Sequence, residues 1–339
     1  MEMGKRQGRI EWIDMAKGYG ILLVIIAHLP VGNVEYWINT FHMPLFFFLS
    51  GYVFHVKDSF FTFLKKRVKG LLVPYFFLGL VIILFETLLS LWKHQFSIKA
   101  VGNLFLALFL QKRTWTLWYL AVLFFMNLVF YWIVKWAKKH WQVLLISVLM
   151  AAIGLAYYGL GGTALFWNID VVLPAMPFMA AGYVAARYDY LWEKGLKKPW
   201  LAMGLVLILA AVTWGFEWMS YQIAGHGLWM FYNKYGMPVC TYVAALTGTA
   251  CVCIIARLVT LRPIRYLGEN TLVYFGWHQS IMIFLANRLL NELGFYLLDT
   301  SSTQFRFNFN LAMLIIILFT LTVCNVILTK TKLKVLLGK

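Results

Sequence analysis

Two long apolar runs decide the solvent in which this chain can fold. Residues 71–91 and 309–329 are each close to the roughly 20 apolar residues that cross the hydrocarbon core of a bilayer. Backbone polar groups in lipid must be hydrogen-bonded within their own segment, so runs of this length predict α-helices. Charged residues make up only 13% of the chain, whereas soluble domains carry about 25%. The sequence therefore predicts an all-α polytopic membrane protein.

We expect about ten transmembrane helices in one bundle, with residues 1–339 forming a single domain. No linker rich in Ser or Gly separates a soluble module, and no segment repeats along the chain. The expected spans are residues 12–29, 42–56, 71–92, 115–134, 141–158, 171–187, 199–220, 237–258, 266–287 and 309–329.

We attribute the net charge of +17 to the orientation of the chain in the membrane rather than to binding of nucleic acid. Most of the 30 Lys and Arg residues fall in segments that are cytoplasmic if the N-terminus is inside. This bias is the positive-inside signal, and it predicts that both termini are cytoplasmic. It also favours attraction to anionic lipid in the bilayer. The four Cys residues lack zinc-ligand spacing, so we predict no metal site.

The first expected span carries ionisable residues, which inside a membrane indicate function. Asp14 and Lys17 are three residues apart and are therefore neighbours on a helix surface. Lys17 and His28 are eleven residues apart, which places them on one face and separates them by about 16 Å. Gly18 and Gly20 leave room for a neighbouring helix or a ligand. The alternative is that Lys17 only snorkels and that His28 only bonds a nearby carbonyl.

The second expected span adds a His and a small-residue pair. His42 lies at its outer end, at a depth similar to that of His28, so two imidazoles are expected to share an outer-side cavity. Ser50 and Gly51 lie near mid-span, where small residues allow tight helix packing. Ser50 is also a candidate for contact with a substrate.

Other candidates have a structural and a functional interpretation. Trp118 opens the fourth span, where it belongs either to an aromatic belt or to a substrate cavity. His278 lies halfway along the ninth span and is a weaker substrate-binding candidate. Lys66, Arg67 and Lys69 precede the third span, where they either anchor the helix or clamp phosphates.

Several motifs together resemble the acyltransferase 3 family of bacterial membrane-bound acyltransferases, particularly its fucose 4-O-acetylase-like branch. The resemblance covers nearly the whole chain and is most specific in its first three motifs. The similar segments, in family order, are WIDMAKGYGILLVIIAH at 12–28, FHMPLFFFLSGYVF at 41–54, FLKKRVKGLLVPY at 63–75, LWYL at 117–120, LPAMPFMAAGYVAA at 173–186 and YLGENTLVYFGWHQSIM at 266–282.

The resemblance implies a ten-helix bundle in a bacterial inner or plasma membrane. Such proteins move an acyl group, often acetyl, from cytoplasmic acyl-CoA to a hydroxyl of a cell-surface carbohydrate or its lipid-linked precursor. It implies that His28 is the catalytic His, Lys17 its basic partner, and Arg67 and Lys69 the CoA-binding pair. Lys17 and Lys69 stand where many members have Arg, so each keeps the charge but lacks the planar fork.

The chemistry of such a transfer suggests roles for the remaining candidates. A neutral imidazole can accept a proton near pH 7, so we expect His28 to deprotonate the attacking hydroxyl. Asp14 would orient Lys17, and Lys17, His42 or a backbone amide would stabilise the oxyanion. Direct transfer is simpler than an acyl-enzyme intermediate. The competing classes are a glycan or lipid-linked-sugar transporter or flippase, and a sensor or assembly subunit with an inactive site.

Overall fold

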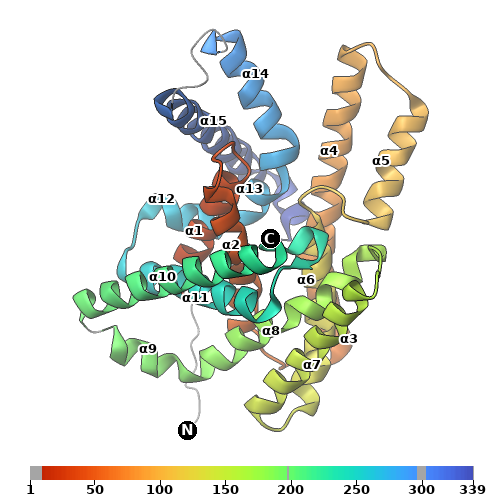
Figure 1. Ribbon diagram of the computed structural model, residues 1–339. Coiled ribbons are helices and arrows are strands. Elements are labelled where there is room, and N and C mark those ends of the chain that lie inside the picture. The colour runs from red at the N-terminus through yellow and green to blue at the C-terminus, as the bar shows by residue number, and fades with distance from the viewer. Residues whose placement is uncertain (1–9, 197, 296–302, 339) are drawn as a thin grey trace.

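The computed structural model describes residues 10–196, 198–295 and 303–338, and helices make up nearly all of it (Figure 1). Its elements in chain order are α1 (Glu11–Ala27), α2 (Val34–Tyr52), α3 (Phe60–Arg67), η1 (Val68–Leu72), α4 (Val73–Trp92), α5 (Ile98–Leu110), α6 (Trp118–Trp136), α7 (His140–Gly159), η2 (Phe166–Asn168), α8 (Ile169–Ala185), η3 (Ala186–Tyr188), α9 (Asp189–Gly195), α10 (Pro199–Ala224), β1 (Leu228–Trp229), η4 (Met230–Tyr232), β2 (Lys234–Tyr235), α11 (Pro238–Leu258), α12 (Arg262–Glu269), α13 (Thr271–Trp277), η5 (His278–Ile283), α14 (Phe284–Glu292), α15 (Thr303–Lys330) and η7 (Lys332–Leu337).

Seven helical stretches among the described residues are long and apolar enough to cross a membrane. They are Phe60–Trp92, Trp118–Trp136, His140–Gly159, Phe166–Trp192, Pro199–Ala224, Pro238–Leu258 and Thr303–Lys330. The expectation of an all-α membrane protein is confirmed. The total of ten spans and the cytoplasmic placement of the termini remain predictions.

The other three expected spans lie where the chain is more polar or the helix is broken. The helix α1 has 17 residues and includes Glu11, Asp14 and Lys17. The helix α2 runs over Val34–Tyr52 rather than 42–56, so it begins in a polar segment. The expected ninth span is divided among α12, α13, η5 and α14, which together replace one continuous helix.

The helices α1 and α2, which carry the candidate polar residues, lie in the middle of the bundle (Figure 1). They pack against each other, and both contact α11, whereas α12 packs on α1 and α8 on α2. In contrast, only 17% of the apolar stretch of α10 and 22% of the apolar stretch of α7 are buried within the protein. Helices surrounded by protein need not be uniformly apolar, so the chemistry-bearing residues can sit on α1 and α2.

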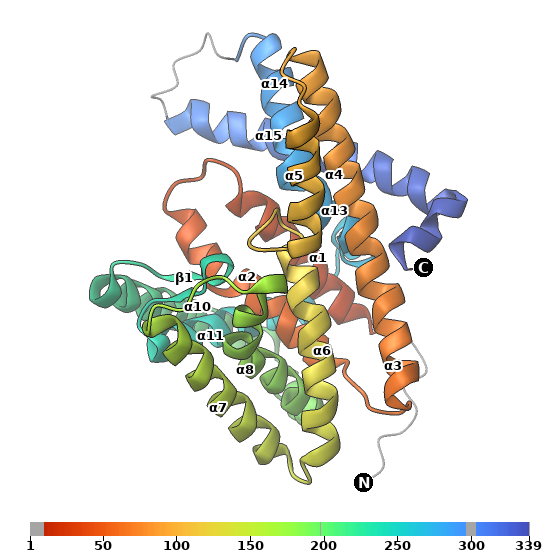
Figure 2. The ribbon, with the colours of Figure 1, turned by 90° about the vertical axis from the view of Figure 1, so that its right-hand side faces the viewer.

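The segment between α4 and α6 contains a short apolar helix, α5. Figure 2 shows α5 running beside α4, and the Tyr75 hydroxyl of α4 donates a hydrogen bond to the Leu108 carbonyl of α5. Gly79 faces Leu108 at the same crossing. The two helices thus form a hairpin that carries the chain back to the start of α6.

Glycine lets α2 and α8 approach backbone to backbone. A Cβ atom at Gly51 would overlap the Met179 carbonyl oxygen, and one at Gly182 would overlap the Phe48 carbonyl oxygen. The same holds between α1 and α12, where a Cβ at Gly18 would overlap the backbone of α12. The prediction that Gly51 and Gly18 permit tight packing is confirmed.

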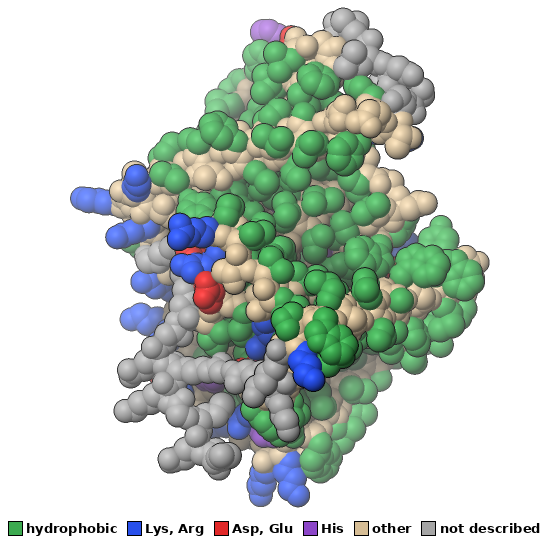
Figure 3. All heavy atoms as spheres, turned by 90° about the vertical axis from the view of Figure 1, so that its left-hand side faces the viewer, with side chains coloured by type: hydrophobic (Ala, Val, Ile, Leu, Met, Phe, Trp, Pro, Cys, Tyr) green, Lys and Arg blue, Asp and Glu red, His purple; other side chains and the backbone are tan. Residues whose placement is uncertain are grey.

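The outer surface separates apolar and cationic side chains. In the view of Figure 3, hydrophobic side chains cover most of the face, and most of the Lys and Arg side chains gather along one edge. This arrangement is typical of a protein whose sides meet lipid tails and whose charged edge meets headgroups.

Candidate active site

A cavity of about 570 Å³ opens at the end of α1 where His28 terminates the helix. Its walls come from the end of α1, the first half of α2, the loop before α6, the β1–η4 segment, the end of α13 and η5. The lining residues are Val24, Ala27, His28, Glu35, Asn39, His42, Met43, Trp115, Thr116, Trp118, Leu228, Trp229, Met230, Phe231, Tyr232, Phe275, Gln279 and Ser280.

The backbone hydrogen-bond partners of His278 determine its tautomer. Its Nδ1 atom lies 2.9 Å from the Phe275 carbonyl oxygen and 3.0 Å from the Tyr274 carbonyl oxygen. A carbonyl oxygen only accepts hydrogen bonds, so Nδ1 carries the hydrogen and Nε2 keeps a lone pair. His278 begins the π-helical turn η5, a distortion that is common at functional sites.

The same reasoning then assigns the tautomer of His28. Its Nδ1 atom lies 2.8 Å from the Val24 carbonyl oxygen and 3.4 Å from Nε2 of His278. Both partners accept, so Nδ1 of His28 carries the hydrogen and shares it between them. The Nε2 atom of His28 therefore holds the free lone pair. The two rings meet edge to face, with centroids 4.8 Å apart.

His42 presents a third imidazole to this cavity. Its Nδ1 atom lies 2.9 Å from the Ile38 carbonyl oxygen, so Nδ1 donates and Nε2 keeps its lone pair. Pro44, two residues further along α2, has no N–H to bond the carbonyl one turn before it. A backbone irregularity thus lies beside His42.

The loop before α6 forms one wall of the cavity in a strained backbone conformation. Gln111, Arg113 and Trp115 all have positive φ angles, of 42°, 55° and 47°. Each such residue costs free energy and persists only where its surroundings hold it, commonly at a functional site. One restraint is the Thr116 hydroxyl, which donates to the Phe275 carbonyl oxygen over 3.1 Å.

A buried ion pair joins the loops around this wall. The Arg113 guanidinium donates to the Asp170 carboxylate, and the Arg113 backbone N–H donates to Oδ1 of Asn168 over 3.0 Å. The Asn233 amide lies within 3.5 Å of the same carboxylate. Three loops that are distant in sequence are therefore fixed to one another beside the cavity.

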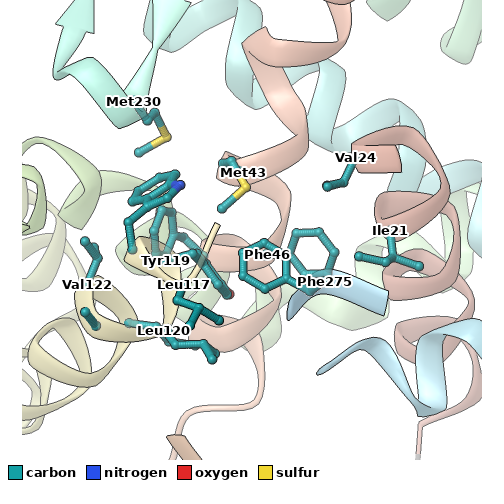
Figure 4. Packing of buried hydrophobic residues seen from close by; sticks show 14 of the residues in the cluster. Ile21, Val24, Met43, Phe46, Leu117, Tyr119, Leu120, Val122, Met230 and Phe275 are labelled. Atoms are coloured by element: carbon teal, nitrogen blue, oxygen red, sulfur yellow. The ribbon is translucent and has the colours of Figure 1, made fainter. Parts of the chain in front are cut away.

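Packed apolar side chains adjoin the cavity. Phe275 is one of the lining residues, and Figure 4 shows it grouped with Phe46 and Tyr119 below Met43 and Met230. The ring centroids of Tyr119 lie 6.0 Å from Phe46 and 5.3 Å from Phe275. We call Phe46, Tyr119 and Phe275 the aromatic layer.

The structure gathers four of the residues singled out in the sequence. His28, His42 and Trp118 line the cavity, and His278 contacts His28 from behind. Ser50 is not among the lining residues, and its hydroxyl donates to the Phe46 carbonyl oxygen over 2.8 Å.

Asp14 and Lys17 lie in the first half of α1. Asp14 is buried and Lys17 is half-buried, and neither is among the cavity-lining residues. With 1.5 Å of rise per residue, Lys17 lies about 16 Å from His28 along α1. The geometry therefore separates these two positions rather than bringing them to one centre.

The basic residues at the start of the third span differ in their surroundings. Lys66 pairs with Asp58 over 2.6 Å, and the Arg67 guanidinium lies 4.7 Å from the Phe63 ring centroid. Nε of Arg67 is buried and has no hydrogen-bond partner among the described residues. Lys69 is exposed, and its carbonyl lies close to Gly338 of the C-terminal segment. No cation of this group lines the cavity.

The sequence reasoning did not identify several cavity residues. Glu35 and Asn39 were placed before the second span, but α2 begins at Val34 and includes them. Together with His42 they follow the i, i+4, i+7 spacing of one helix face, which is the signal that could have found them. Residues 228–232 fall between the expected spans 199–220 and 237–258, yet this segment supplies a wall of the cavity.

The fold and the site define a helical membrane protein with an imidazole-lined cavity near one end of its central helices. A family model described as an acyltransferase domain matches residues 10–329. The chain therefore belongs to the acyltransferase 3 family and is a membrane acyltransferase. No curated protein and no solved structure gives a significant match.

Proposed function

We propose that this protein is an O-acyltransferase that moves an acyl group, preferably acetyl, from cytoplasmic acyl-CoA to a carbohydrate hydroxyl. The acceptor would be a cell-surface glycan or its lipid-linked precursor at a bacterial inner or plasma membrane. The observation that carries the proposal is the free Nε2 lone pair of His28 at the wall of the cavity. A fixed tautomer with one exposed lone pair is the arrangement that a general base requires.

In the proposed reaction the base and the nucleophile meet in this cavity. Nε2 of His28 takes the proton of the acceptor hydroxyl while its oxygen attacks the thioester carbonyl carbon. The tetrahedral intermediate then breaks its carbon–sulfur bond, which releases the CoA thiolate and leaves the ester. The proton on His28 passes to that thiolate, so the imidazole returns to its starting form.

Burial disfavours the charged ring that this step creates, and neighbouring groups offset part of that cost. Once Nε2 is protonated, Nδ1–H still donates to the Val24 carbonyl and to Nε2 of His278. The Glu35 carboxylate also interacts electrostatically with His28. These groups are already in place, so they stabilise the imidazolium without reorganisation.

The oxyanion would be stabilised by backbone amides rather than by Lys17 or His42. Lys17 lies about 16 Å from His28 along α1, which is beyond contact with the reacting atoms. In neutral His42 the Nε2 atom carries a lone pair and no hydrogen, so it accepts hydrogen bonds and does not donate them. His42 is better suited to bind a hydroxyl of the acceptor.

The donor would reach His28 from the basic end of the third span. In the proposal, Lys66, Arg67 and Lys69 hold the CoA phosphates, and the pantetheine arm extends beside α1 past Lys17. Phe46 and Tyr119 of the aromatic layer pack against each other beside the cavity. In the proposal they move to admit the arm, a conformational step of the kind that limits many enzymes.

The test is acetyl transfer by the purified protein in lipid nanodiscs, with radiolabelled acetyl-CoA and extracted cell-surface glycans. We expect label in the glycan as a base-labile ester. Translocation of unmodified glycan in proteoliposomes, with no label transferred, would support the transporter alternative instead. If the protein neither labels the glycan nor translocates it, the result would favour an inactive assembly subunit.

A further inference from the structure

The charged residues that line the cavity restrict what can bind there. This inference rests on the proposed function. Glu35 contributes a carboxylate, and none of the described residues that line the cavity is Lys or Arg. Two basic residues of the segments around the cavity are Arg113 and Lys234. Arg113 is paired with Asp170, and Lys234, on the strand opposite Trp229, is not among the lining residues.

Glu35 is held in place from two sides. Its backbone N–H donates to the Gly32 carbonyl over 3.1 Å at the start of α2. One carboxylate oxygen lies 3.4 Å from Nδ2 of Asn39, one turn along the same helix. The side chain is half-buried, and the remaining oxygen can accept from an occupant of the cavity.

Three of the polar groups facing the cavity only accept hydrogen bonds, whereas side chains such as Asn39 and Gln279 also donate. Nε2 of His28 and Nε2 of His42 hold lone pairs, and the Glu35 carboxylate only accepts. A sugar hydroxyl donates, so several hydroxyls on one ring satisfy these groups at once. A carboxylate or phosphate on the occupant would instead face a like charge across a confined, partly dry space.

We propose that the unit bound in this cavity is an uncharged polyol, such as a neutral hexose residue, and that Glu35 excludes acidic sugars. The indole and phenol faces of Trp118, Trp229 and Tyr232 supply apolar surface for the sugar ring. This selection is separate from the electrostatic interaction of Glu35 with His28, so it is measured as binding of the acceptor without acyl-CoA.

The test compares two probes that differ at one carbon, methyl β-glucoside and methyl β-glucuronide. Binding to the full-length protein in nanodiscs is measured by saturation-transfer NMR without acyl-CoA. We expect the neutral glycoside to bind at least about tenfold more tightly than the acidic one. Glu35→Gln should reduce this preference to within about threefold, and Glu35→Lys should reverse it.

A matched control separates the local effect from general surface charge. Glu292 on α14 is 70% exposed and pairs with Arg288, so Glu292→Gln removes one charge away from the cavity and should keep the preference. The proposal is overturned by equal binding of both probes, by binding of neither, or by a preference that survives in Glu35→Gln. Acetyl transfer is assayed in parallel, because selective binding without transfer would sink the proposed function alone.

Discussion

Nε2 of His278 lies 3.4 Å from Nδ1 of His28, and two backbone carbonyls behind His278 decide which of these nitrogens carries the hydrogen. The buried carbonyls thus fix the tautomer of His278, and His278 in turn fixes the tautomer of His28. His278 is fully buried, whereas His28 is half-buried and reaches the cavity. Only His28 is therefore placed to exchange a proton with a substrate.

Removal of the His28 imidazole should nearly abolish transfer. General-base catalysis contributes about 10²–10⁴-fold, so His28→Ala should lower kcat by at least about 100-fold. The measurement is steady-state acetyl transfer in nanodiscs. His94→Ala serves as the control, because His94 is an exposed residue between α4 and α5. Wild-type turnover in His28→Ala would remove this residue as the base.

Loss of His278 should weaken catalysis without weakening donor binding. In His278→Phe, Nδ1–H of His28 keeps the Val24 carbonyl but loses its second acceptor. We expect kcat to fall about tenfold with an unchanged KM for acetyl-CoA. His278→Gln, which can accept through its amide oxygen, should recover part of the rate. A purely structural role would instead show loss of thermal stability in both variants and no recovery.

Charge reversal at the basic end should act on the donor. Lys69→Glu should raise the KM for acetyl-CoA by about tenfold and leave kcat within about twofold, because phosphate binding lies far from the bond that breaks. Arg67→Lys should raise KM less, since it keeps the charge but loses the fork. Lys139→Glu, on the loop before α7, is the control. Equal effects of Lys69→Glu and Lys139→Glu would indicate a role in membrane anchoring only.

The sequence predicted the helical architecture well where helices meet lipid. Long apolar runs are sufficient to identify α10 and α15, because lipid demands them regardless of neighbours. It failed at α2, where the apolar pattern begins at residue 42 but the helix begins at Val34. The first turns of α2 are partly exposed and carry the cavity residues Glu35 and Asn39, so they are polar and hydropathy assigns them to a loop.

The candidate site was predictable as a set of residue types but not as a geometry. Unexpected ionisable groups in apolar segments identified His28, His42 and His278. No spacing rule shows that His278 touches His28, because 250 residues separate them. The wall formed by residues 228–232 was also hidden, since a short hairpin between long helices carries no strong periodic signal.

The glycine contact between α2 and α8 should be sensitive to one methyl group. Gly51→Ala forces a Cβ into the Met179 carbonyl, and overpacking of this kind costs about 1–3 kcal/mol. We expect a lower Tm, measured by fluorescence-detected unfolding in detergent. Gly204→Ala in α10 is the matched control, because its added Cβ meets nothing within 4 Å. A Tm unchanged in Gly51→Ala would show that the helices are not in such close contact.

The ion pair beside the cavity should contribute mainly to holding the strained loop. Asp170→Asn leaves the Arg113 guanidinium buried without its carboxylate, and breaking a buried pair costs about 3–5 kcal/mol. Arg113→Met should cost a similar amount, because it strands the carboxylate instead. The double variant should then be less destabilised than the two single changes added together, since neither charge is left alone. Additive losses of stability would mean that the two side chains do not depend on each other. Trp115 belongs to the same loop and lines the cavity, so both single variants should also raise the KM for the acceptor.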